Sequence, residues 1–234
     1  MKSFIDNRTI RDETAPTHFS LENSHATKIV FQNAPFVWQE FSFLNRANER
    51  HNWVFDQTIF NQRDKQAKQH FPVIIHENSI TFQTDPSCQL ADALFQVTYS
   101  LFEDNSLTIK FDNLNDTGSD LASIFLKTGW RLASDWTKSL QIYSKPLELS
   151  QDDVGNPEKQ LWAPALFDPK KQAAVILENN QTKATLQIFS NFDGLAWSLM
   201  ALKQEKILSL TMQNRIIDGR SQDHGYWITY KIKS

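Results

Sequence analysis

The chain has 234 residues and a formal net charge of −3, and 40% of it is apolar and 12% aromatic. This composition can build a packed core, which excludes a disordered chain, and the lack of a dense basic cluster excludes a nucleic-acid partner. The single cysteine, Cys88, excludes an intramolecular disulfide and fits a reducing compartment. The first residues turn charged before a signal peptide could form, and no apolar run reaches the roughly 20 residues that span a bilayer. We therefore expect a cytoplasmic protein with no membrane partner.

The N-terminal part of the chain differs from the rest. Residues 1–27 are polar and show no hydrophobic period, so we expect a loosely held N-terminal arm or an irregular first strand. Residues 28–234 show short β-type runs separated by turn residues, and we predict a single β-sandwich domain over this range. The first of these runs, at 28–31, 36–44 and 53–56, are rich in aromatic and β-branched residues, as strands usually are.

Two pairs of runs further along the chain predict β-hairpins. Residues 95–102 and 107–111 alternate between apolar and polar on either side of a polar turn, and residues 173–178 and 185–189 flank a second polar turn. Helical periodicity is weak throughout, and residues 195–205 are the best helix candidate. We therefore predict an all-β fold, an antiparallel β-sandwich or supersandwich.

One loop before the last expected strand gathers groups that can bind a ligand: Arg220, Asp223 and His224. Loops held by a β scaffold often carry binding groups, although Asp223 also suits an ordinary turn. We take these three as candidate binding residues. The chain has no Gly-rich phosphate loop, no Cys-x-x-Cys pair and no nucleophile elbow, so we expect neither a metal nor a cofactor.

Tryptophan is unusually frequent, with seven in the chain. A Trp ring can stack on the apolar C–H face of a sugar while polar neighbours bind the hydroxyl edge. Trp130, followed by Arg131, and Trp162, followed by Ala163 and Pro164, suit this role and are the remaining candidate binding residues. The alternative is that tryptophans fill the core, and we expect four or five of them to do so.

Three segments carry a resemblance to a known superfamily. The strand at 79–82 and the hairpin at 95–113 resemble the central strands of the galactose mutarotase-like, or aldose epimerase-like, β-supersandwich. The run at 184–195 is similar to a later strand and turn of the same superfamily. The resemblance implies a small sugar or an oligosaccharide as the ligand. If the domain is an enzyme, the resemblance implies an aldose epimerase-like isomerase.

The chain departs from that superfamily at its catalytic positions. Epimerases of this kind carry a catalytic His soon after the hairpin and a general-base Glu near the C-terminus. This chain has no His between His76 and His224, and its last Glu is Glu205, so no catalytic residue carries over. We expect a carbohydrate-binding or carbohydrate-processing domain and leave catalysis open. The alternative is a non-enzymatic β module, either a lipocalin-like barrel for an apolar ligand or a protein-interaction domain.

Overall fold

The structure, a computed structural model, is built almost wholly of β-strands. Apart from one 3-10 turn at Gln151–Asp153, the regular structure of the described residues is all strand, which confirms the predicted all-β class. No helix in this part of the chain is long and apolar enough to cross a membrane. The described residues are 2–5, 18–33, 36–45, 47–61, 73–83, 95–114, 124–132, 140–147, 149–178, 184–202, 205–213 and 225–233.

The strands form three sheets, in which neighbouring strands pair antiparallel. Sheet A has the order β1 (Lys2–Ile5), β2 (His18–Glu22), β3 (Lys28–Asn33), β4 (Phe36–Leu44) and β5 (Arg50–Asn52). Sheet B has the order β14 (Lys159–Trp162), β17 (Gly194–Leu202), β18 (Glu205–Gln213), β11 (Ile124–Leu132) and β6 (Val54–Asn61). Sheet C has the order β13 (Lys145–Pro146), β12 (Leu140–Ile142), β15 (Val175–Glu178), β16 (Thr185–Ser190), β19 (Tyr226–Lys233), β10 (Ser106–Asn113), β9 (Phe95–Leu101), β8 (Ser79–Gln83) and β7 (Val73–Ile75).

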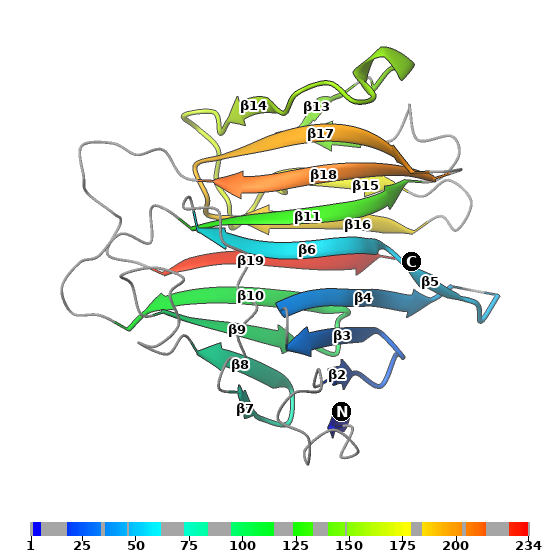
Figure 1. Cartoon of the computed structure of the whole chain (residues 1–234), viewed down its shortest axis with the longest axis vertical. Helices are drawn as coiled ribbons and strands as arrows, with labels where there is room; N and C mark the ends of the chain where they lie inside the picture. The colour runs from blue at the N-terminus through cyan, green and yellow to red at the C-terminus, as the bar shows by residue number, and fades with distance from the viewer. Residues whose placement is uncertain are drawn as a thin grey trace.

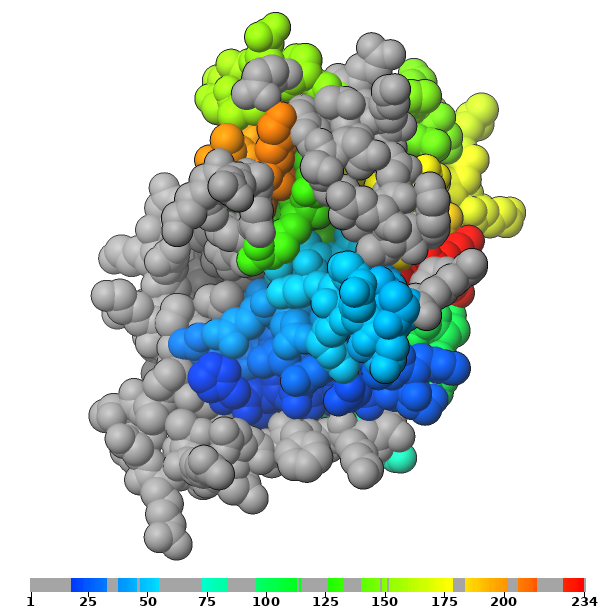
Figure 2. Space-filling view, turned by 90° about the vertical axis from the view of Figure 1, so that its right-hand side faces the viewer, coloured from blue at the N-terminus to red at the C-terminus, as the bar shows by residue number. Residues whose placement is uncertain are grey.

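Sheets A and B lie side by side in one layer, and sheet C forms a second layer behind them (Figure 1). Trp53, between β5 and β6, joins the first two sheets. Its N–H donates to the Phe41 carbonyl at 3.0 Å, and its own carbonyl accepts from the Arg131 N–H at 2.9 Å. In the turned view of Figure 2, the orange strands of sheet B lie to the left, the red end of the chain lies to the right, and the blue strands of sheet A cross the middle. Each sheet keeps two edge strands among the described strands, so the sandwich is open and the lipocalin-like barrel alternative is wrong.

Both predicted hairpins are confirmed, as β9–β10 and β15–β16. The helix candidate at 195–205 is wrong, because its first eight residues belong to strand β17. Leu195 and Leu199 of this strand face the core, while Ala196 is also buried, at 1% exposed, on the opposite face. A strand that is buried on both faces loses the apolar–polar alternation that would identify it in the sequence.

The N-terminal segment takes part in the fold. Residues 18–22, inside the expected arm, form β2 and pair with β3 along their whole length. Phe19 and Leu21 are buried in the shared core. Asn23 ties the β2–β3 turn to sheet C, since its amide donates to the Phe102 carbonyl at 2.9 Å. The boundary expected at residue 28 therefore does not mark the edge of the core.

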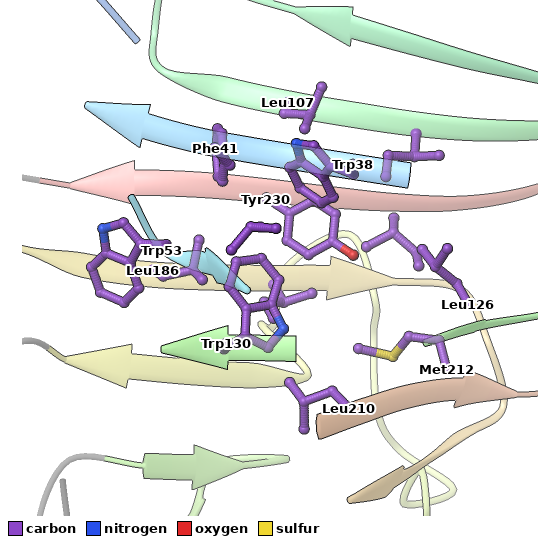
Figure 3. Close-up of a cluster of buried hydrophobic side chains, with 14 of the residues drawn as sticks. Trp38, Phe41, Trp53, Leu107, Leu126, Trp130, Leu186, Leu210, Met212 and Tyr230 are labelled. Carbon is purple, nitrogen blue, oxygen red and sulfur yellow. The ribbon is translucent and has the colours of Figure 1, made fainter. Parts of the chain in front are cut away.

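One apolar core lies between the two layers and draws side chains from all three sheets (Figure 3). Its centre is aromatic: Trp38 of β4, Trp130 of β11 and Tyr230 of β19 pack with ring centroids 5.2–6.1 Å apart. Offset and edge-on ring pairs at such distances add stability beyond the area they bury. Four tryptophans of the described segments are buried, in line with the expected four or five: Trp38, Trp53, Trp130 and Trp197.

Candidate functional site

The five candidate residues from the sequence have different outcomes. Arg220, Asp223 and His224 lie outside the described residues, so their role as binding residues stays a prediction. Trp130 is 0% exposed and packs against Trp38 and Tyr230 in the core. We correct the expectation that Trp130 stacks on a ligand, because a side chain enclosed between the two layers offers no ring face to a sugar.

Trp162 has the position that a stacking residue needs. It ends the edge strand β14, and 37% of it is exposed. Trp162 pairs with Gly194 of β17, and a Cβ added to Gly194 would lie 2.4 Å from Cε3 of the Trp162 ring. The ring therefore lies directly on the backbone of β17, and any side chain at position 194 would push it away. Glycine at this position lets a flat aromatic ring cover the sheet.

The ring lies on the face of sheet B that points away from the core, which we call the outer face. Leu208, Leu210 and Met212 of β18 point into the core, so the alternate positions of this strand face outward. Sheet B is in front of sheet C in the view of Figure 1, with its outer face turned to the reader. One outward position, Ile207, is apolar and 0% exposed. Three others are polar and form what we call the β18 stripe: Ser209, Thr211 and Gln213.

Two side chains of the β18 stripe have buried polar atoms with no hydrogen-bond partner. These atoms are Ser209 Oγ and Gln213 Nε2, and Ser209 is only 2% exposed. Burial of a polar group without a hydrogen bond costs free energy, so such atoms are uncommon in folded proteins and suggest a missing partner. Gln213 lies opposite Gly194, and Trp162 covers Gly194. The unpaired amide is thus next to the exposed ring.

An ion pair crosses the middle of the outer face. Glu158, just before β14, accepts a hydrogen bond from Lys127 Nζ of β11 at 2.8 Å and one from Thr211 Oγ1 of β18 at 3.4 Å. The Glu158 side chain therefore reaches across β17, which lies between β14 and β18. Lys127 and Glu158 are 39% and 37% exposed, so both can also contact a molecule above the sheet. We call this pair the Lys127–Glu158 bridge.

The architecture matches known structures. No protein-family model matches the chain, and no curated protein matches its sequence. A GalM/aldose epimerase homologue from C. elegans superposes with a TM-score of 0.64 at 9% identity, covering 94% of this chain and 99% of the other. The chain has the aldose epimerase-like fold. A candidate aldose 1-epimerase from Escherichia coli K12 gives a TM-score of 0.56 at 9% identity, covering 92% and 99% of the two chains. A protein from Synechocystis sp. PCC 6803 gives 0.55 at 12% identity, covering 94% and 96%.

In this aldose epimerase-like fold, the outer face of sheet B offers three kinds of chemistry. Trp162 supplies an apolar ring, the β18 stripe supplies unpaired hydroxyl and amide groups, and the Lys127–Glu158 bridge supplies a carboxylate beside an ammonium group. Among the described residues, no three His, Cys, Asp or Glu side chains are close enough together to hold a metal ion. The groups present suit a neutral ligand with many hydroxyls.

Among the described residues of this candidate site, sequence reasoning found only Trp162. The run from Ile207 to Gln213 does alternate between apolar and polar positions after its first residue, and this signal could have placed the β18 stripe on one face. The positions of Lys127 and Glu158 could not be found in this way. They come from segments about thirty residues apart, and only the order of strands in sheet B brings them together.

Proposed function

We propose that this domain binds a carbohydrate on the outer face of sheet B. The observation that carries the proposal is the placement of the exposed Trp162 ring beside the buried, unpaired Nε2 of Gln213. A sugar ring has an apolar C–H face and a polar hydroxyl edge. Its face would lie on Trp162, while a hydroxyl oxygen would accept a hydrogen bond from Gln213 and remove the cost of the unpaired amide.

The neighbouring charged groups support this arrangement. The Glu158 carboxylate can accept hydrogen bonds from sugar hydroxyls and the Lys127 ammonium can donate to them, and charge-assisted hydrogen bonds are the stronger kind. The segment that contains Arg220, Asp223 and His224 begins directly after Gln213, the last residue of β18. We therefore keep these three residues in the proposal as further ligand contacts. A cytoplasmic location remains part of the same proposal.

Binding can be tested by titrating the purified protein with a panel of mono-, di- and trisaccharides in a calorimeter. We expect Trp162→Ala to weaken binding of any saccharide that binds by about tenfold, which corresponds to 1.4 kcal/mol. Leu166→Ala is the matched control, because Leu166 is 95% exposed only four residues further on and should leave the affinity unchanged. If no saccharide binds the wild-type protein, the proposal is wrong and a protein-interaction domain becomes the better hypothesis.

A second candidate function, interconversion of sugar anomers, is favoured by the Lys127–Glu158 bridge. Opening a cyclic hemiacetal requires a base to take the proton of the C1 hydroxyl and an acid to protonate the ring oxygen as the C1–O bond breaks. Both oxygens are bonded to the same carbon. A carboxylate and an ammonium group with their atoms 2.8 Å apart can reach them together, with Glu158 as the base and Lys127 as the acid.

Anomer exchange can be followed by polarimetry on freshly dissolved sugars. If the bridge is catalytic, we expect Glu158→Gln to lower the rate by about 100-fold or more, the usual contribution of a general base. Asp153→Asn is the control. Asp153 also pairs with a lysine, Lys159 at 2.6 Å, and hydrogen bonds from Lys159 and Ser150 lower its pKa to about 2. Equal rates in the wild type and in both variants would limit the function to binding.

A further inference from the structure

The edge strand β14 carries a row of three side chains on the outer face of sheet B. Leu161 packs against the core, and successive residues of a strand point to opposite faces, so Gln160 and Trp162 face outward. Glu158, two residues before Gln160, extends over the same face and forms the Lys127–Glu158 bridge there. We call these three residues the β14 row: Glu158, Gln160 and Trp162. One segment thus presents a carboxylate, an amide and an aromatic ring on one side.

Gln160, in the middle of this row, is open to solvent. Its partner on β17 is Ala196, whose methyl group is too short to cover the amide. An exposed glutamine on an edge strand often has no role beyond solvation. This one differs, because it lies between the exposed Trp162 ring and the Glu158 carboxylate. A ligand that contacts both of them passes over Gln160.

Two amides border the Trp162 ring on different sides. The ring covers Gly194, and Gln213 lies opposite Gly194 on the neighbouring strand β18. Gln160 lies two residues before Trp162 on the same strand, so their Cα atoms are roughly 6.6 Å apart. One amide is therefore reached across the strands and the other along the strand. A sugar that stacks on the ring offers a different edge to each of them.

The amide of Gln160 can bind two hydroxyl groups at once. Its oxygen accepts a hydrogen bond, and its NH2 group, attached to the same carbon, donates. Hydroxyls on adjacent carbons of a pyranose ring match this pair, one as the donor and one as the acceptor. We propose that Gln160 is a specificity-determining residue that binds two adjacent hydroxyls of a hexose stacked on Trp162. This inference rests on the proposed carbohydrate binding and states which feature of the sugar the site recognises.

Calorimetric titration with D-glucose, D-galactose and D-mannose, and with the monodeoxy analogues of each, tests the inference. For at least one hexose, we expect removal of either of two adjacent hydroxyls to weaken binding about fivefold or more, because the analogue leaves part of the amide without a partner. Gln160→Met keeps the length of the side chain and removes both polar groups. It should weaken binding of the parent hexose about fivefold to tenfold and abolish discrimination at those two positions, while discrimination at the other hydroxyls remains. Gln141→Met, in strand β12 of sheet C, is the matched control and should leave every affinity unchanged.

The outcomes separate this inference from the proposed function. If no saccharide of any length binds, the proposed function fails. If a hexose binds but Gln160→Met keeps the wild-type affinity, or discriminates among the deoxy analogues as the wild type does, the inference fails while carbohydrate binding stands. Binding of longer saccharides without binding of any of the hexoses also overturns it. Because Gln160 is exposed, the thermal midpoint of Gln160→Met should match that of the wild type, so a lost affinity reports on the ligand contact.

Discussion

At the scale of single residues, the sequence allowed Trp130 to be either a ligand-stacking residue or a core residue, and the structure shows that it is a core residue. Its neighbour Arg131 suggested a binding residue, yet the ring lies 5.2 Å from Tyr230 and 6.1 Å from Trp38, between centroids. Its indole Nε1 is buried without a partner, whereas Trp38 Nε1 donates to the Glu40 carbonyl at 2.6 Å. The two buried indoles therefore contribute differently, one by packing alone and one also by a hydrogen bond.

This difference leads to a prediction about stability. Trp130→Phe removes the unpaired N–H and keeps an aromatic ring, so the free energy of unfolding should fall by less than about 1.5 kcal/mol. Trp130→Ala leaves a large cavity and should lower it by about 3–5 kcal/mol. Urea unfolding followed by circular dichroism measures both. A large loss in Trp130→Phe would contradict the description of the Trp130 indole N–H as unpaired.

At the scale of elements, a contact between two turns holds the sheets together. Asn23 is 5% exposed in the β2–β3 turn, and its Oδ1 accepts from the N–H groups of His25 and Thr27 at 3.0 and 2.9 Å. Its Nδ2 donates to the Phe102 carbonyl and to Asn105 Oδ1 in the β9–β10 turn, at 2.9 and 3.0 Å. One amide therefore uses its oxygen to shape its own turn and its nitrogen to bind a turn of the opposite layer.

Asn23→Ala tests this contact. The change would leave the buried Thr27 N–H without its acceptor and would remove the amide's hydrogen bond to the Phe102 carbonyl, which keeps the Asn105 N–H at 3.2 Å. We therefore expect the free energy of unfolding to fall by about 1–3 kcal/mol. Ser24→Ala removes only an exposed hydrogen bond across the same two turns, from Ser24 Oγ to Glu103, and should change the free energy of unfolding by no more than about 1 kcal/mol. Chemical unfolding of the two variants under the same conditions gives the comparison. Equal stability of both variants would show that the amide contributes nothing to joining the turns.

The strands also show which sequence signals were sufficient to predict them. The β9–β10 hairpin and strand β19 could be predicted because each buries one face only, and the burial of β19 alternates along its whole length. Strand β17 could not be predicted, because Leu195 and Ala196 are both buried on opposite faces and the strand therefore lacks apolar–polar alternation. The arm at 1–27 was judged by its polar composition, although Phe19 and Leu21 within it alternate as a strand does and are buried.

At the scale of the whole molecule, the N-terminal strands and the rest of the chain share one core. Leu21 of β2 is 0% exposed and belongs to the same cluster as Trp130 of sheet B and Tyr230 of sheet C. If this core is a single cooperative unit, Leu21→Ala should lower the free energy of unfolding by about 2–5 kcal/mol, with coincident transitions by fluorescence and circular dichroism. Ile74→Ala on the edge strand β7, where Ile74 is 45% exposed, should cost much less. If Leu21→Ala left the free energy of unfolding unchanged, the result would support the expectation that residues 1–27 are loosely held.

The sequence by itself determined the β class, the main hairpins and the resemblance to aldose epimerase-like proteins, because these depend on alternation and turn residues that are neighbours in the chain. It also singled out Trp162, next to a proline-containing turn. Only the tertiary structure decided that Trp130 is a core residue and that Ser209 and Gln213 are unpaired beside the Lys127–Glu158 bridge. These properties depend on which strands are neighbours in sheet B, and strands distant in sequence become neighbours through the packing of the whole sandwich.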